Sequence, residues 1–159
     1  MPPSTAPQLR PATNADREQV KDLVYTVLAE YGLKHDPDTT DADLKDIEQF
    51  YLARGGAFRV LEAENGAIIG AYGLYPMGEE SCELRKMYLR RDYRGQGLGR
   101  RLLDDALAEA RRLGFKSVVL ETASVLKEAI ALYESCGFVP YQPDHLSSRC
   151  DQAYRMELE

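Results

Sequence analysis

A glycine-rich turn between a strand pattern and a helix pattern constrains the fold of this chain most. The turn spans residues 94–99 (RGQGLG), at the centre of the run from Glu83 to Leu113. Glycine has no Cβ, so the backbone can take positive φ there and let a ligand approach closely. The first four N–H groups of the helix that follows have no intrahelical partner and carry partial positive charge. The turn therefore predicts a phosphate-binding helix start.

The sequence around this turn is basic although the whole chain is acidic. Residues 85–101 contain seven of the 20 basic residues and one acidic residue, Asp92, whereas the chain has 26 acidic residues and a net charge of −6. This contrast indicates an anionic ligand at the turn and argues against a nucleic-acid binder or an anionic membrane surface. The alternative is that the arginines form a solvated face and the glycines merely a tight turn.

The length and composition predict one soluble domain. The chain has 159 residues, of which 44% are hydrophobic and 29% charged. Residues 1–8 hold three prolines and predict a flexible tail, so the domain covers 9–159. No apolar run could span a bilayer and the start lacks a signal-peptide pattern, so we expect the cytoplasm. Three widely spaced cysteines predict reduced thiols and no metal site.

Hydrophobic periodicity predicts about four helices. The first follows a cap at Thr13 or Asn14 and ends at Gly32, and the second runs from Thr40 to the glycine pair at 55–56. The third covers 98–113 and the fourth 127–135.

Six or seven strands are expected between these helices. They lie near 9–12 and at 57–63, 67–75, 82–89, 117–122, 138–141 and 153–158. Asn65 and Gly66 predict a type I′ hairpin turn in which both residues have positive φ. Strands joined by helices imply a locally parallel pair. The sequence therefore predicts an α/β (α+β) mixed sheet flanked by helices.

Two motifs carry a resemblance to a known family. The first is the turn Arg94-x-x-Gly97-x-Gly99, preceded by the strand end at 87–89 (MYL), and the second is 129–138 (AIALYESCGF), at the expected distance downstream. Together they resemble the GNAT superfamily of acyl-CoA-dependent N-acetyltransferases over nearly the whole chain. The resemblance implies a mostly antiparallel central sheet with a parallel, splayed strand pair at the cofactor site, and acetyl-CoA as cofactor.

The resemblance also implies which residues hold the cofactor. The turn would wrap the pyrophosphate, and backbone groups of Met87 and Leu89 would pair with the pantetheine arm. Many members carry an asparagine where this chain has Leu126, so Ser124 or Thr122 would supply a hydroxyl instead or cap the next helix. The full expected set is Met87, Tyr88, Leu89, Arg94, Gly95, Gln96, Gly97, Leu98, Gly99, Arg100, Ser124 and Tyr133.

Acetyl transfer to an amine needs a base, an oxyanion donor and an acid. Glu83 lies eleven residues before Arg94, the spacing of the catalytic glutamate in the histone-acetyltransferase branch, and is the candidate base. Glu121 is the second candidate, and Glu83 could instead be a strand residue paired with Arg85 or Lys86. Tyr133 takes the general-acid position toward the leaving thiolate, or else packs in its helix face. The N–H of Leu89 would meet the oxyanion.

The acceptor would be held by the first helices and by loops near the last strands. The expected substrate-binding residues are Tyr31, His35, Tyr75, Glu121 and Arg149. Arg149 could clamp a carboxylate, which favours an amino-acid-like acceptor, or be a surface residue. The function implied is acetyl transfer from acetyl-CoA to a primary amine of a small molecule. Alternatives are a protein N-terminal or lysine acetyltransferase and a non-catalytic acyl-CoA sensor. A homodimer is compatible with the sequence.

Overall fold

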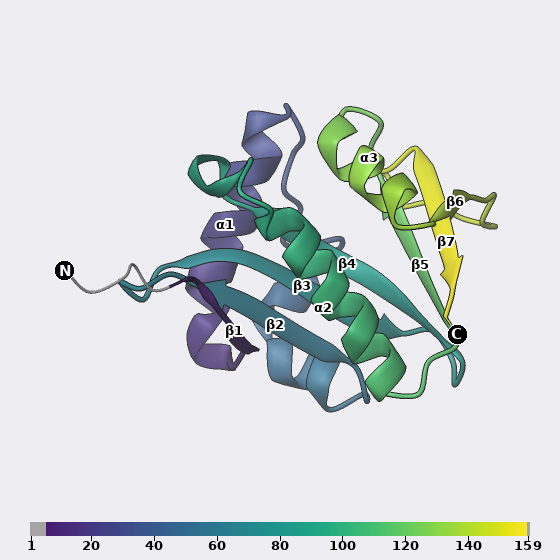
Figure 1. Cartoon of the computed structure of the whole chain (residues 1–159), viewed down its shortest axis with the longest axis horizontal. Coiled ribbons are helices and arrows are strands. Elements are labelled where there is room, and N and C mark those ends of the chain that lie inside the picture. The colour runs from purple at the N-terminus through teal and green to yellow at the C-terminus, as the bar shows by residue number, and fades with distance from the viewer. Residues whose placement is uncertain (1–5, 159) are drawn as a thin grey trace.

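The protein is built on a twisted, seven-stranded mixed sheet with helices on both faces (Figure 1). The computed structural model describes residues 6–158. The strand order is β1-β2-β3-β4-β5-β7-β6, and every neighbouring pair is antiparallel except β4 with β5. The strands are β1 (Gln8–Pro11), β2 (Ala57–Glu62), β3 (Ile68–Pro76), β4 (Ser81–Leu89), β5 (Ser117–Thr122), β6 (Val139–Pro140) and β7 (Gln152–Glu157). The predicted mixed sheet is confirmed.

Three longer helices cover the sheet: α1 (Arg17–Glu30), α2 (Leu98–Arg112) and α3 (Lys127–Ser135). The predicted cap at Thr13 belongs to the short turn that leads into α1: its hydroxyl accepts from the N–H of Ala15 (3.2 Å), and Asp16 accepts from the N–H of Thr13 (2.9 Å). A short 3₁₀ turn, η1 (Asn14–Asp16), lies between this cap and α1. In the view of Figure 1, α2 crosses the front of the sheet and α1 lies behind it.

The single second helix predicted between Thr40 and the glycine pair is wrong. The segment contains a 3₁₀ turn, η2 (Ala42–Lys45), and a π-helical turn, η3 (Glu48–Leu52). Asp46 separates them with φ of −152°, and its carboxylate accepts from the N–H of Gln49 (3.0 Å). A short polar side chain that bonds nearby backbone competes with the helix ladder in this way.

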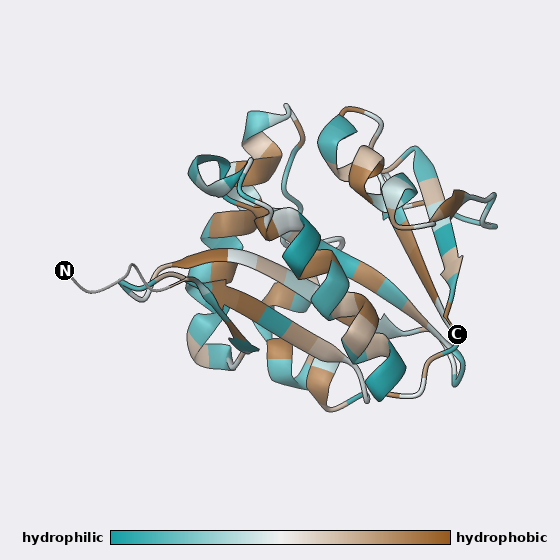
Figure 2. Ribbon diagram, in the orientation of Figure 1, coloured by the Kyte–Doolittle hydropathy of each residue, from teal (hydrophilic) through white to brown (hydrophobic). Residues whose placement is uncertain are grey.

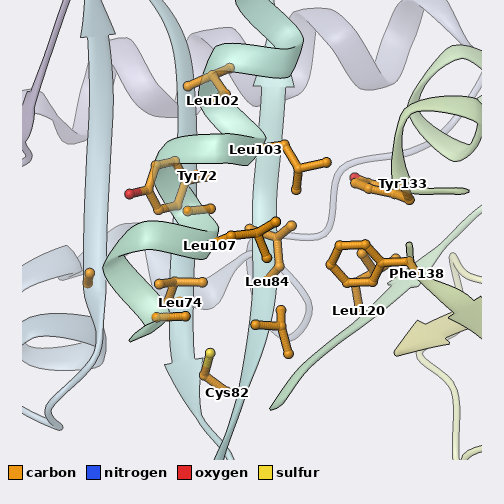
Figure 3. Close-up of a cluster of buried hydrophobic side chains, with 14 of the residues drawn as sticks. Tyr72, Leu74, Cys82, Leu84, Leu102, Leu103, Leu107, Leu120, Tyr133 and Phe138 are labelled. Carbon is orange, nitrogen blue, oxygen red and sulfur yellow. The ribbon is translucent and has the colours of Figure 1, made fainter. Parts of the chain in front are cut away.

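The two faces of the sheet carry separate apolar clusters. One face packs against α2, whose buried leucines and alanines recur with helical spacing, and against Tyr133 and Phe138 from the α3 region (Figure 3). Figure 2 shows these apolar positions of α2 alternating with polar ones. The other face packs against α1, η2 and η3. The sheet is therefore buried on both sides around its centre.

The hairpin of β2 and β3 is confirmed, but its type I′ turn is wrong. Gly66 has φ of +87°, whereas Lys86 is the one non-glycine among residues 6–158 with positive φ, so Asn65 does not have it. The carbonyl of Ala63 accepts from the N–H of Gly66 (2.9 Å), and the N–H of Ala63 donates to Ala67 (2.8 Å). The connection is thus a three-residue loop with glycine at its left-handed position.

The parallel pair is formed by β4 and β5, which α2 connects. It is short: Ser81 to Glu83 pair with Ser117 to Val119, and beyond that the strands diverge (Figure 1). The splayed pair implied by the resemblance is confirmed. The same inference, that a helix joins a parallel pair, is wrong for β5 and β6, the strands that α3 connects, because β7 lies between them.

The ends of the chain add two observations. Strand β1 begins at Gln8, within the predicted tail, and residues 1–5 lie outside the described part. Within residues 6–158, no helix is both long enough and apolar enough to cross a bilayer.

Candidate functional site

A cavity of about 900 Å³ lies where β4 and β5 diverge. It is lined by β4 from Glu83 onward, the glycine turn, the start of α2, the end of β5, α3, the end of α1 and loop residues that include 39–40 and 145–150. The cavity thus reaches from the α2 side of the sheet through the strand gap to the α1 side. The two sides offer different chemistry.

The glycine turn presents backbone N–H groups on the α2 side. Gly95 and Gly97 have φ of +78° and +81°, and a Cβ added to either would meet no atom within 4 Å. Gly97 caps α2 without any side-chain hydrogen bond, and the helix ladder begins with the N–H of Arg101 donating to Gly97 (3.1 Å). The N–H groups of 98–100 therefore precede the ladder and fit a phosphate group.

Arg94 anchors this turn with its side chain. Its guanidinium donates to the carbonyl of Leu89 (3.0 and 2.9 Å), to Glu30 (2.8 Å) and to the hydroxyl of Tyr31 (3.3 Å). The turn is thereby tied to the end of β4 and to the last turn of α1. The carbonyl of Leu89 is occupied by these bonds.

The strand gap leaves backbone groups of β4 without a strand neighbour. After Glu83, β4 has no pairing on its β5 side, while Met87, Tyr88 and Leu89 line the cavity. Backbone N–H and C=O groups need a partner. An extended arm containing amides could supply that partner, as the pantetheine of coenzyme A would.

Tyr133 projects from α3 toward the gap. It is 6% exposed, its ring contacts Phe138 edge-on with centroids 5.7 Å apart, and it lines the cavity (Figure 3). Burial, and secondarily the neighbouring Tyr88, raise the pKa of its hydroxyl above the ordinary value. The hydroxyl is therefore protonated at neutral pH and can donate a hydrogen bond or a proton.

Two carboxylates lie on the α1 side of the gap. Glu83 pairs with Val119 in the parallel register, and side chains two residues apart share a face, so Glu83, Arg85 and Glu121 face the same side. The Nε of Arg85 donates to Glu83, and the N–H of Ser147 donates to Glu121 (2.8 Å). The predicted alternative of a basic partner for Glu83 is therefore present, and its role as base stays a prediction.

Most of the predicted site residues are brought together by this cavity. The lining includes Met87, Tyr88, Leu89, Arg94, Gly95, Gly97, Gly99, Arg100 and Tyr133 of the cofactor set, and Tyr31, Glu121 and Arg149 of the substrate set. Five predicted residues are not part of the lining. Among these, Gln96 and Leu98 belong to the turn and the start of α2, with Leu98 buried in the core.

The other three have different partners. His35 stacks on Tyr25 with ring centroids 4.1 Å apart, and Tyr75 packs beneath the guanidinium of Arg85 at 4.1 Å. Ser124 donates from its hydroxyl to Asp151 (2.7 Å). Leu126, in place of the family asparagine, lines the cavity as an apolar residue.

Comparison with known proteins identifies the family. Residues 22–138 match the Acetyltransferase (GNAT) family. The chain is 44% identical over 138 residues to the uncharacterized N-acetyltransferase YjgM of Escherichia coli (strain K12), covering 84% of this chain and 82% of that protein. This chain belongs to the GNAT family.

Solved structures agree on the fold. A GNAT-family acetyltransferase of Staphylococcus aureus superposes with a TM-score of 0.91 at 23% identity, over 97% of this chain and all of that one. The acetyltransferase yncA of Salmonella typhimurium, described with its cofactor acetyl-CoA, gives a TM-score of 0.76 at 22% identity, over 98% and 95% of the two chains. The seven-stranded sheet with its β4–β5 gap is thus the GNAT fold.

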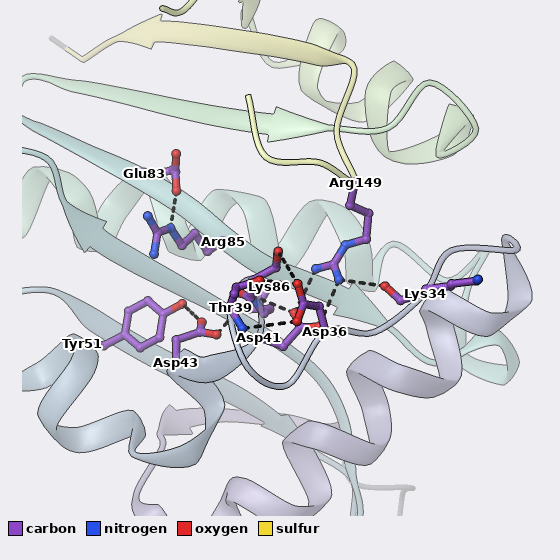
Figure 4. Close-up of polar contacts among 11 residues, drawn as sticks. Lys34, Asp36, Thr39, Asp41, Asp43, Tyr51, Glu83, Arg85, Lys86 and Arg149 are labelled. Atoms are coloured by element: carbon purple, nitrogen blue, oxygen red, sulfur yellow. Dashed lines mark hydrogen bonds and ion pairs between the residues drawn. The ribbon is translucent and has the colours of Figure 1, made fainter. Parts of the chain in front are cut away.

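Sequence reasoning missed a buried ionic cluster beside the gap of this GNAT chain. Lys86 lies at a bulge of β4 with φ of +55°, and its ammonium contacts Asp41 and Asp43 (3.3 Å each) and the carbonyl of Thr40 (3.0 Å) (Figure 4). Asp43 also accepts from the buried hydroxyl of Tyr51. The two aspartates are 1% and 2% exposed. In the sequence, Asp41 and Asp43 stand at the polar start of a predicted helix, and this position does not indicate that their side chains are buried.

Arg149 completes this cluster from the far end of the chain. Its guanidinium donates to both oxygens of Asp41 (3.0 and 2.9 Å) and to the carbonyl of Lys34 (3.1 Å). The loop before β7 is thereby tied to the loop after α1, across the α1-side mouth of the cavity (Figure 4). From the sequence, Arg149 could clamp the carboxylate of a substrate. In the structure its two terminal amino groups bind Asp41 of the same chain instead, so they are not free to bind a substrate carboxylate.

This cluster predicts an acid-sensitive contribution to stability. Burial alone would raise the pKa of Asp41, but the bonds from Arg149 and from the N–H of Asp36, with Lys86 nearby, lower it overall. A lowered native pKa means that the contribution is complete above the ordinary pKa near 4 and is lost as pH falls through the native value. We expect Asp41→Asn to flatten the fall in unfolding free energy below about pH 4.

Urea unfolding at a series of pH values measures this effect. The control is Asp38→Asn, whose contact with Lys45 is exposed at 3.7 Å, and which should match the wild type. Identical pH curves for wild type and Asp41→Asn would contradict the assignment.

Proposed function

We propose that this chain is an N-acetyltransferase that moves the acetyl group of acetyl-CoA to a primary amine of a small molecule by direct transfer. One observation carries the proposal. A single cavity joins a phosphate-binding turn on one side of the sheet to Glu83 and Glu121 on the other, through a gap beside Tyr133. Donor and acceptor would meet in that gap.

The donor side fits coenzyme A through backbone groups. The turn at 95–99 and the start of α2 would hold the pyrophosphate, and the unpaired edge of β4 would hold the pantetheine. Acetyl-CoA would supply the activated thioester. The yncA structure with acetyl-CoA supports this choice of donor. Leu126 lines the same cavity, so contacts at this position would be apolar.

Proton transfers would be divided between the two sides. An alkyl amine has a pKa of about 10, so it must lose a proton before attack, and Glu83 is the proposed base with Glu121 second. A leaving thiolate has a pKa of about 8.5, and the protonated Tyr133 can donate to it. The N–H of Leu89 stays the predicted oxyanion donor.

A small acceptor is favoured over a peptide by the shape of the α1-side mouth. The Arg149–Asp41 contact joins the two loops that border it, and both partners are largely buried. A peptide acceptor would need these loops apart. The presence of both Glu83 and Tyr133 in the cavity also argues against a non-catalytic acyl-CoA sensor. Cytoplasmic location and a homodimer stay predictions.

The donor assignment is tested at Gly97. Gly97→Ala places a methyl group in the open space before α2 and strains a backbone at φ of +81°. We expect binding of acetyl-CoA to weaken at least tenfold by calorimetry, because the methyl group would occupy the phosphate position. Gly114→Ala is the matched control, since Gly114 has φ of +89° and an open Cβ position at the other end of α2. Equal affinity of both variants would refute the phosphate site.

The acid assignment is tested at Tyr133. Tyr133→Phe keeps the ring against Phe138 and removes the hydroxyl, so we expect kcat to fall on the order of 100-fold while acetyl-CoA still binds. Tyr154→Phe is the control, because Tyr154 is a buried tyrosine outside the cavity. Thiol release from acetyl-CoA in a screen of amines and amino acids is the measurement. Unchanged turnover of Tyr133→Phe would exclude the acid role.

The assignment of Glu83 as the base is tested by comparing substitutions of Glu83 and Glu121. Glu83→Gln should lower kcat on the order of 100-fold and alter the acidic limb of the pH–rate profile, because amide nitrogen and oxygen cannot accept the proton. Glu121→Gln should lower kcat by a smaller factor. A larger loss in Glu121→Gln would transfer the role to Glu121.

A further inference from the structure

Arg85 stands out among the basic side chains that line the cavity. Its side chain is 28% exposed and faces the α1 side beside Glu83. The Nε donates to Glu83, and the guanidinium carbon lies 4.1 Å from the ring centroid of Tyr75. Within residues 6–158, no hydrogen bond involves its two terminal amino groups, and Figure 4 draws a single dashed line from it, to Glu83.

Of the other lysine and arginine side chains that line the cavity, three are bound within the chain and the fourth lies on the donor side. Lys86 is held between two aspartates and a carbonyl, and Arg149 lies on both oxygens of Asp41. Arg94 is bound to Glu30 and to the end of β4, and Arg100 lies on the donor side with Asp104 (3.1 Å). Among the lysines and arginines at the acceptor end, Arg85 is thus the one whose two terminal amino groups both have no hydrogen-bond partner in residues 6–158.

The geometry points to Arg85 as the residue that selects the acceptor, and to an acceptor that carries a carboxylate next to its amine, as an α-amino acid does. This inference rests on the proposed N-acetyltransferase function. The terminal amino groups of a guanidinium form a planar fork that matches a carboxylate, and the stacking on Tyr75 holds the plane in one orientation.

The neighbouring carboxylates would receive the amine. Arg85 occupies one oxygen of Glu83, and Ser147 occupies one oxygen of Glu121. The remaining oxygens face the same side of the gap as the Arg85 fork, which is the complement of an ammonium beside a carboxylate. An acceptor without a carboxylate would leave the desolvated fork unpaired, and a diamine would bring a second positive charge toward it. Both should be poor acceptors.

The test compares matched acceptors by thiol release from acetyl-CoA. Each of a set of L-α-amino acids is measured against its α-amide and its decarboxylated amine. In the wild type, kcat/KM for the acids should exceed that for the amides about 10- to 100-fold, the range expected for hydrogen bonds to a charged group. In Arg85→Met this ratio should fall to about one.

The ratio is the decisive readout because Arg85 also contacts Glu83. A purely positioning role would lower the rates of acids and amides alike and leave the ratio unchanged. Arg54→Met is the matched control, since Arg54 also stacks on Tyr75, at 5.6 Å, but does not line the cavity. Its ratio should equal that of the wild type. Should Arg85→Met not fold, Arg85→Gln, which is polar and uncharged, carries the same test.

Two results would overturn the inference: a wild-type ratio near one, or a ratio that Arg85→Met or Arg85→Gln leaves unchanged. Acetyl-CoA binding with turnover of amines but not of amino acids would also overturn it and leave the proposed function standing. No calorimetric binding of acetyl-CoA and no thiol release with any acceptor would instead refute the proposed function.

Discussion

The gap between β4 and β5 is the constraint on which the rest of the site depends. Three residue pairs hold the two strands together, and the gap begins immediately after Glu83. Two residues of β4, Lys86 and Met87, oppose Tyr72 of β3 in the register, and a bulge of this kind bends and twists its strand. The bulge therefore lies in the part of β4 that has lost its β5 neighbour, where the cavity opens.

The buried ionic cluster explains how such a bulge is maintained. A lysine at φ of +55° is unfavourable, and burying an ammonium is costly unless it is paired. Asp41, Asp43 and the carbonyl of Thr40 supply that pairing. The same Asp41 binds Arg149, so one carboxylate links the bulge of β4 to the loop before β7. The Asp41 side chain thus connects the conformation of β4 at its bulge to the position of the loop before β7.

The sequence predicted those parts of the fold and site that depend on local chemistry. Glycines at 95, 97 and 99, the apolar spacing of α2 and the segment around Tyr133 each carry their signal within a few residues, and the family match agrees with them. The break at Asp46 and the three-residue loop at 64–66, in which Asn65 lacks the predicted positive φ, depend on individual backbone bonds that periodicity does not reveal. The Arg149–Asp41 contact joins residues 108 positions apart, and a charged loop residue looks the same in sequence whether it is solvated or buried.

This long-range contact also changes how the acceptor end is understood. From the sequence, Arg149 was the candidate to bind a substrate carboxylate, and Arg85 only a partner for Glu83. In the folded chain Asp41 saturates Arg149, and the bulge directs Lys86 into the same cluster, so both cations stabilise the loops. Arg85 lies just before the bulge, where β4 still pairs with β3 but no longer with β5, and its Nε donates to Glu83 in the gap. The bulge in β4 thus separates Lys86, which is buried in the ionic cluster, from Arg85, whose fork faces the acceptor end of the cavity.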